Sequence, residues 1–120
     1  MEWDKLTNQK LFNWLVENYT DKKFELKENG IICKLGSNVE CDYHVGMLSK
    51  KMEWWNSLIL VHVGVTQTKG TLQGSSGAVD NFDDLKIYVE DCFKRGKDWD
   101  DVQKSKNVVT GKKEIRKRLF

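Results

Sequence analysis

Two runs of alternating apolar and polar residues meet at Asn29-Gly30, and this junction constrains the fold more than any other feature of the chain. Residues 22–28 precede the dipeptide and residues 31–35 follow it. Asn and Gly both tolerate the positive φ of a type I′ turn, so the dipeptide is a favoured two-residue hairpin loop. The sequence therefore predicts an antiparallel sheet that contains this hairpin.

A two-residue loop also determines which residues of the hairpin face each other. With Asn29-Gly30 as the loop, Leu26 is expected opposite Cys33. In this register apolar side chains meet apolar ones and opposite charges meet, which favours it. The remaining expected pairs are Glu28 with Ile31, Phe24 with Leu35, and Glu25 with Lys34.

Two further segments have the pattern of strands. Residues 39–47 alternate between apolar and polar side chains, which is typical of a strand with one buried face. Residues 57–67 are apolar on both faces near their start, which favours a place inside the sheet. Residues 68–79 are rich in glycine and serine, so we expect Lys69 to Ala78 to be the most mobile internal segment.

Helical patterns flank the strands. Residues 8–19 carry a broad apolar face behind Thr7, a suitable N-cap. Residues 82–95 carry a second apolar stripe, with Asp80 or Asn81 as the cap and Gly96 as the residue that ends the helix. A short helix capped by Asp98 is expected to follow. The sequence predicts an α+β fold with an N-terminal helix, an antiparallel sheet of about four strands, and one or two C-terminal helices packed on one face.

Charge divides the chain into two parts. Residues 104–118 hold seven basic residues and one acid, whereas residues 1–103 hold 13 basic and 17 acidic residues. A length of 120 residues suits one domain. We therefore expect residues 1–103 to form a single compact domain, followed by a basic C-terminal segment at 104–120.

The cellular setting is predicted from missing signals. The apolar run that begins at Leu58 is too short to cross a bilayer, and the first residues lack the apolar stretch of a secretory signal. Three cysteines are an odd number and form no disulfide framework, so they are interpreted as free thiols. These features favour a cytoplasmic protein that does not engage a membrane.

No motif in the chain predicts catalysis. The glycine-rich stretch at 70–74 lacks the spacing and the lysine of a phosphate-binding loop. Cys41 and His44 have C-x2-H spacing, but alternation places them on opposite faces of a strand. His44 and His62 share a face with Asp42 and Glu40 if their strands are neighbours, which leaves a metal or acid–base cluster as the alternative to ordinary sheet histidines. We expect no catalytic residues, no cofactor and no metal, and therefore a protein that is not an enzyme.

Three groups of residues are candidates for binding. Neighbours on an extended chain point to opposite sides, so Trp54 and Trp55 cannot both enter the core, and the exposed one with Lys50 and Lys51 has the composition of a protein-binding hot spot. Aspartates form a possible acidic surface that mimics phosphates: Asp83, Asp84, Asp98, Asp100 and Asp101. Basic residues near the C-terminus are candidates for contacts with a phosphate backbone: Lys112, Lys113, Arg116, Lys117 and Arg118.

These features predict a small interaction protein that binds, and modulates or inhibits, a protein partner. The alternative is a nucleic-acid-binding protein that uses the basic C-terminal segment and exposed aromatic residues. In organisation alone, a helix followed by an antiparallel sheet and a return helix resembles small phage and mobile-element proteins, including some small anti-CRISPR inhibitors. That resemblance implies a partner among the host enzymes that act on nucleic acids.

Overall fold

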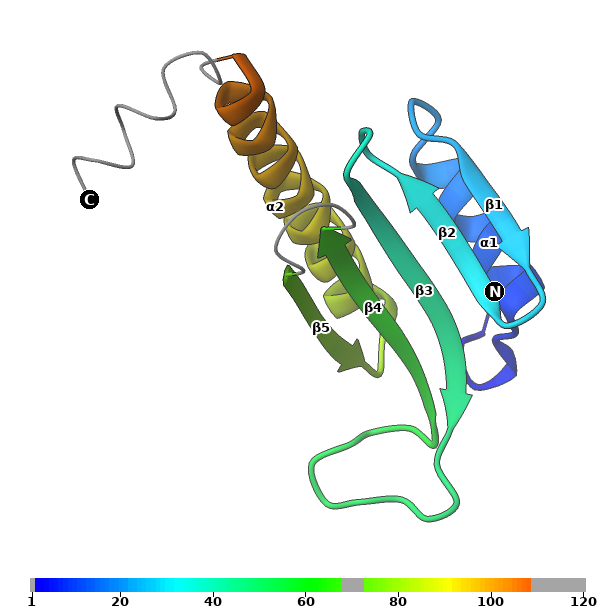
Figure 1. Cartoon of the computed structure of the whole chain (residues 1–120). Helices are drawn as coiled ribbons and strands as arrows, with labels where there is room; N and C mark the ends of the chain where they lie inside the picture. Colours follow the sequence, from blue (N-terminus) through cyan, green and yellow to red (C-terminus); the bar gives the residue numbers. More distant parts are fainter. Residues whose placement is uncertain (1, 68–72, 109–120) are drawn as a thin grey trace.

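Figure 1 shows the computed structural model of the chain, which describes residues 2–67 and 73–108. In this part, a short 3-10 helix η1 (Trp3–Lys5) and helix α1 (Asn8–Asn18) precede the strands, and helix α2 (Phe82–Val108) follows them. Five strands form one antiparallel sheet in the order β1-β2-β3-β4-β5. Their bounds are β1 (Phe24–Lys27), β2 (Gly30–Lys34), β3 (Val39–Met47), β4 (Ile59–Gln67) and β5 (Gln73–Val79). The predicted α+β class is confirmed, with five strands rather than about four.

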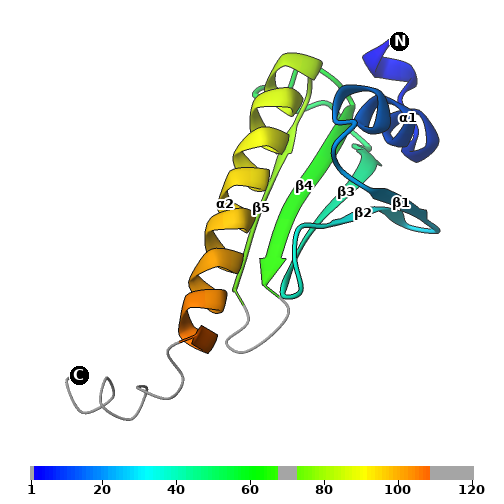
Figure 2. The ribbon, with the colours of Figure 1, turned by 90° about the horizontal axis from the view of Figure 1, so that it is seen from above.

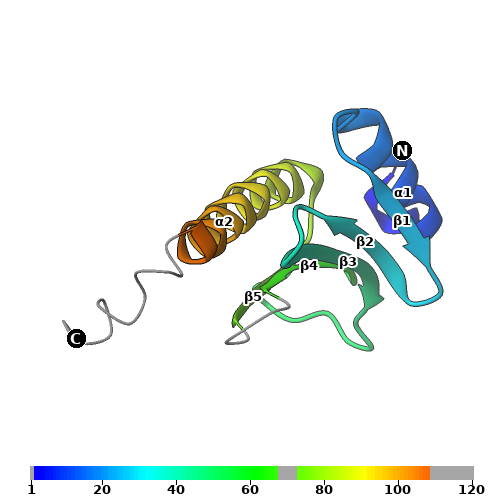
Figure 3. The same cartoon turned by 45° about the horizontal axis from the view of Figure 1, so that its top comes forward.

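Both α-helices pack on the same face of the sheet, as Figures 2 and 3 show from two directions. The core lies between these helices and the sheet, and its buried side chains come from every layer. The opposite face of the sheet carries no helix in the described part of the chain. Fully buried members of the core include Leu11 and Leu15 of α1, Tyr43 of β3, Val61, Val63 and Val65 of β4, and Leu85 and Val89 of α2.

Side-chain caps begin both α-helices, as the sequence predicted. The Lys10 backbone N–H donates to Thr7 Oγ1 over 3.2 Å, and the Asp84 backbone N–H donates to Asn81 Oδ1 over 2.8 Å. Each bond satisfies one of the amide groups that a helix leaves without a partner at its start. The caps therefore place both helix starts where local sequence alone indicated.

Aromatic side chains from α1, from its C-cap Tyr19 and from α2 meet on the helix-bearing side of the sheet. The rings of Trp14 and Phe82 have centroids 5.8 Å apart, and those of Tyr19 and Phe93 meet edge to face at 5.3 Å. Trp3 extends this contact, because its ring meets Phe82 edge to face at 4.9 Å. Its indole N–H donates to the Ile59 carbonyl oxygen over 2.8 Å. Paired aromatic rings of this kind add to the stability that burial provides.

The hairpin register differs from the prediction. Lys27 pairs with Gly30 and Leu26 with Ile31, so the loop is Glu28-Asn29 and the predicted pair of Leu26 with Cys33 is wrong. No described residue other than glycine has a positive φ, so Asn29 does not take the conformation of a type I′ turn. A Cβ at Gly30 would lie 2.5 Å from the Tyr43 carbonyl oxygen, so the close approach of β3 requires this glycine.

The register shift changes the neighbours of the charged residues as well. Glu25 faces Ile32 rather than Lys34, and it forms its ion pair with Lys27 on its own strand at 2.9 Å. A shift of two residues keeps every side chain on its predicted face of the sheet. For that reason the expected alternation survives although the predicted partners do not.

The fifth strand lies where the sequence predicted a mobile connector. β5 pairs with β4 along its whole length, from Gln67 with Gln73 to Val61 with Val79. The glycine- and serine-rich residues from Gln73 on therefore form a strand instead of a loop, and residues 68–72 lie outside the described part of the chain. Backbone pairing needs no bulky side chains, and Gly77 fits here because a Cβ would lie 2.5 Å from the Tyr88 hydroxyl on α2.

Helix α2 continues through the position where it was expected to end. It is one helix to Val108 rather than a helix ending at Arg95 and a second one capped by Asp98. Gly96 is buried inside it, and a Cβ there would overlap Leu35 Cδ1 and lie 3.0 Å from Val39 Cγ1. The glycine thus allows the helix to lie close to the sheet, and it is not a C-terminal cap.

Candidate functional site

The β3–β4 connection (residues 48–58) and the strand ends beside it carry the main exposed apolar surface. Figure 1 shows this connection extending beyond the ends of β3 and β4. Large apolar side chains exposed among the described residues number seven, and four of them lie here: Met47, Met52, Trp54 and Leu58. Exposed apolar side chains that are concentrated in one segment are candidates for an interaction surface.

Adjacent tryptophans in this connection have different environments, as alternation predicted. The Trp54 side chain is 70% exposed, whereas Trp55 is half-buried. Trp3, Trp14 and Trp99 all pack against the core. Trp54 is therefore the tryptophan that the described fold leaves available, with exposed Lys50 and Lys51 close by in sequence.

Hydrogen bonds hold the ends of the connection in place. The Leu48 backbone N–H donates to the Leu58 carbonyl oxygen over 2.7 Å, which extends the pairing of β3 and β4. The Asn56 backbone N–H donates to Asp80 Oδ2 over 2.7 Å, and the Ser57 hydroxyl donates to Asp4 Oδ1 over 2.8 Å. The bond from Asn56 is the main reason that the pKa of Asp80 lies below its ordinary value. The connection is thus anchored to both the N-terminal segment and the start of α2.

An open pocket of about 330 Å³ lies at the base of the connection. Met47, Leu58 and Ile59 supply its apolar walls, while Asp4 and Lys51 bring one charge of each sign. Met47 belongs to the apolar positions of the alternating segment 39–47, but its side chain is 76% exposed. Alternation along β3 places Met47 on the same face as the buried residues of that strand. Met47 is the last residue of β3, and there its side chain remains open to solvent.

The candidate acidic residues do not form one uniform surface. Asp83, Asp84, Asp98 and Asp101 are exposed on α2. Asp98 pairs with Lys94 at 3.6 Å, and Asp84 accepts a bond from the Asn81 amide over 2.9 Å. Asp100 is buried, and its carboxylate fills the space beside Gly36. Exposed lysines at 86, 94 and 97 interrupt the acidic residues along the same helix.

The candidate basic residues Lys112 to Arg118 lie outside the described part of the chain. The described end of α2 lies at the opposite end of the sheet from the β3–β4 connection (Figure 1). The exposed aspartates near that end of α2 are therefore separated from the connection by the length of the strands.

The helix-free face of the sheet brings the two histidines together. His44 and His62 are direct partners across β3 and β4, with ring centroids 4.5 Å apart and planes 10° from parallel. Asp42 lies on the same face, where its carboxylate covers Gly64. The two histidines were expected to share a face if their strands were neighbours, and β3 and β4 are neighbours.

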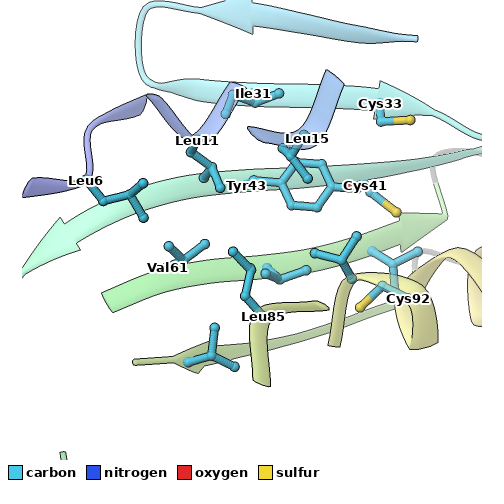
Figure 4. Packing of buried hydrophobic residues seen from close by; sticks show 14 of the residues in the cluster. Leu6, Leu11, Leu15, Ile31, Cys33, Cys41, Tyr43, Val61, Leu85 and Cys92 are labelled. Atoms are coloured by element: carbon cyan, nitrogen blue, oxygen red, sulfur yellow. The ribbon is translucent and has the colours of Figure 1, made fainter. Parts of the chain in front are cut away.

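Cysteines from three elements lie in the core (Figure 4). Cys33, Cys41 and Cys92 are fully buried, and burial raises their pKa values to about 11, 12 and 11. Thiols with such values stay protonated at neutral pH and make poor nucleophiles. Within the described residues, no group of three or more His, Cys, Asp or Glu side chains is arranged to hold a metal ion.

Neither a membrane-spanning helix among the described residues nor similarity to a known protein points to a function. No helix in that part of the chain is long and apolar enough to cross a membrane. Comparison with protein-family models, curated proteins and solved structures finds no match to this chain.

Proposed function

We propose that this chain is a non-enzymatic interaction protein that binds a protein partner through the β3–β4 connection and modulates or inhibits that partner. The observation that supports this most is that Trp54, Met52, Met47 and Leu58 are all exposed on or next to one connection, whose ends are held by hydrogen bonds. Exposed aromatic side chains that become buried on binding are frequent hot spots in protein interfaces.

The anchoring supports this proposal for an energetic reason. A segment that is already ordered loses less conformational entropy when it binds, so more of the contact energy remains as affinity. The bonds to Asp80 and Asp4 restrict the connection at Asn56 and Ser57, next to the exposed side chains. Lys50 and Lys51 then supply charge at the margin, where they affect the rate of association and the choice of partner.

A matched set of variants tests the proposal. Trp54→Ala should lower the amount of a specific protein captured from a lysate and weaken its binding by about 2 kcal/mol or more. The melting temperature should change little, because an exposed side chain contributes little to the core. Ile87→Ala is the matched control, since Ile87 is 68% exposed on α2, far from the connection in sequence. Trp55→Ala, in contrast, should lower the melting temperature.

Salt dependence distinguishes protein binding from the nucleic-acid alternative. Binding to a phosphate backbone through Lys and Arg weakens steeply as salt rises, whereas an interface centred on Trp54 weakens much less. If nuclease treatment removes the captured material, or if replacing the five basic residues at 112–118 abolishes binding while Trp54→Ala does not, the chain binds nucleic acid and the proposal is wrong. Equal binding by Trp54→Ala and Ile87→Ala would also contradict it.

A further inference from the structure

The two histidines of the chain lie side by side at the middle of the helix-free sheet face. Both side chains are exposed, and their rings are stacked with centroids 4.5 Å apart. The bond from Leu48 to Leu58 marks a hydrogen-bonded pair, and such pairs recur at every second position along β3 and β4. The backbones of His44 and His62 are thus hydrogen-bonded to each other directly across the two strands, an arrangement in which the Cα atoms lie about 5.5 Å apart.

Small residues lie next to the pair on the neighbouring strands. Ala78 is the partner of His62 on β5, and Gly30 lies beside the Cβ atom of His44 on the β2 side. Gly46 adjoins the His62 ring, since a Cβ there would lie 3.4 Å from both Cδ2 and Nε2. The neighbours of the two rings on this face are therefore small residues on three strands.

Charged groups on this face, apart from the histidines, come from β1, β2 and β3. Asp42 and Glu40 belong to β3, Lys34 to β2, and Lys27 and Glu25 to β1; the described side chains of β4 and β5 on this face carry none besides His62. Lys27 forms its ion pair with Glu25. Asp42 stands next to the histidines along β3, and its negative charge favours a cation there.

We propose that His44 and His62 form a two-imidazole site for a divalent late first-row transition-metal ion, such as Cu²⁺, Ni²⁺ or Zn²⁺. Neutral imidazole is a good ligand for these ions, and two imidazoles that can converge bind better than one. In the stack the ring planes are parallel, so binding requires the rings to turn until one nitrogen of each points at the same ion. Water completes the coordination, because no described group of three ligands exists.

Such a site differs from a structural metal centre. Closed structural sites use four protein ligands and contribute to folding, whereas an open site exchanges its ion and leaves the fold intact without it. The buried thiols are the competing ligands in the chain, but burial raises their pKa values and keeps them protonated at neutral pH. The histidine pair therefore offers exposed imidazole nitrogens, whereas the three thiols are buried.

The test uses the full chain without any affinity tag and titrates Cu²⁺, Ni²⁺ and Zn²⁺ by calorimetry and equilibrium dialysis. We expect one ion per chain, with Cu²⁺ bound more tightly than Zn²⁺, and at least tenfold weaker binding in both His44→Ala and His62→Ala. Glu40→Gln is the control on the same face and should bind at least half as tightly as the unsubstituted chain. Both histidines are exposed, so the variants should fold, which circular dichroism checks.

Acid supplies a second measurement on the unsubstituted chain. Both rings must be neutral to bind an ion, so affinity should fall as the pH is lowered from 7.5 to 4.5. Affinity that does not fall in acid, or weakening in just one histidine variant, would overturn the two-ligand site. Absence of stoichiometric binding, or binding that persists in both histidine variants, would overturn the site altogether.

Discussion

At the scale of single residues, the neighbours of a side chain decide its chemistry. His62 shows this, because partial burial first and the facing His44 second lower its pKa below the ordinary value of 6.5. A lowered pKa means that the folded protein favours the neutral ring. The contribution of His62 to stability is therefore present above pH 6.5 and is lost as the pH falls below that value.

The two causes of the lowered pKa predict the outcome of a titration. In an NMR titration of the ring protons, His62 should titrate below pH 6.5, and His44→Asn should move its pKa upward without restoring the ordinary value, because burial remains. Thr66→Ala, on the same strand and face, should leave the His62 pKa unchanged. A His62 pKa at or above 6.5, or one that ignores the His44 substitution, would contradict the stacked arrangement.

At the scale of elements, close packing determines where α2 and the sheet meet. Gly96 lies against Leu35, Val39 and Val65, with no space for a side chain. Arg95, next to it, donates to the Ser75 hydroxyl of β5 and pairs with Asp91 of its own helix at 2.7 Å. The helix thus holds the edge strand β5 through a side chain and approaches β3 and β4 through a glycine.

The packing of Gly96 predicts an unusual response to alanine. Alanine favours helices over glycine by about 1 kcal/mol, so Gly96→Ala would stabilise an exposed helix. Here the new methyl group would overlap the side chains of the sheet, and we expect the free energy of unfolding to fall by about 1–3 kcal/mol. Urea denaturation measures the change, with Lys97→Ala as the control at an exposed position of the same helix. A more stable Gly96→Ala variant would show that α2 does not pack in this way.

At the scale of the whole molecule, the core that joins the two layers contains three thiols. Cys33 and Cys41 face each other across β2 and β3, and Cys92 comes from α2. Their pKa values of about 11 to 12 exceed the value of about 8.5 expected for an unfolded chain. Their contribution to stability is complete below that unfolded value and is lost as the pH rises toward the folded one.

The thiols therefore predict sensitivity to alkali. Between pH 9 and 10.5, each buried thiol should lower the free energy of unfolding by up to about 1.4 kcal/mol per pH unit. Urea denaturation under reducing conditions at several pH values measures this slope. Cys92→Ala removes one thiol and should make the slope shallower by that amount, although the variant is less stable at every pH. An unchanged slope would mean that Cys92 ionises equally in the folded and unfolded chain.

Features that depend on near neighbours along the chain could be predicted from the sequence. Thr7 and Asn81 cap their helices because a capping side chain reaches an amide only three residues away. Residues 39–47 form a strand because strict alternation suits one buried face. Likewise, Trp54 and Trp55 differ in exposure, as their adjacency required, although the sequence could not say which one is exposed.

Features that depend on distant partners follow from the packing of the folded chain instead. Gly30 and Gly96 had the local signals of a turn and a helix end, but the approach of β3 and of the sheet gives each a different role. The sequence of β5 has no strand pattern, because its side chains are small and do not alternate between apolar and polar. Its strand conformation depends on backbone pairing with β4. The His44–His62 stack needs both the neighbourhood and the register of β3 and β4. Contacts between residues far apart in sequence set all of these, and no local pattern encodes them.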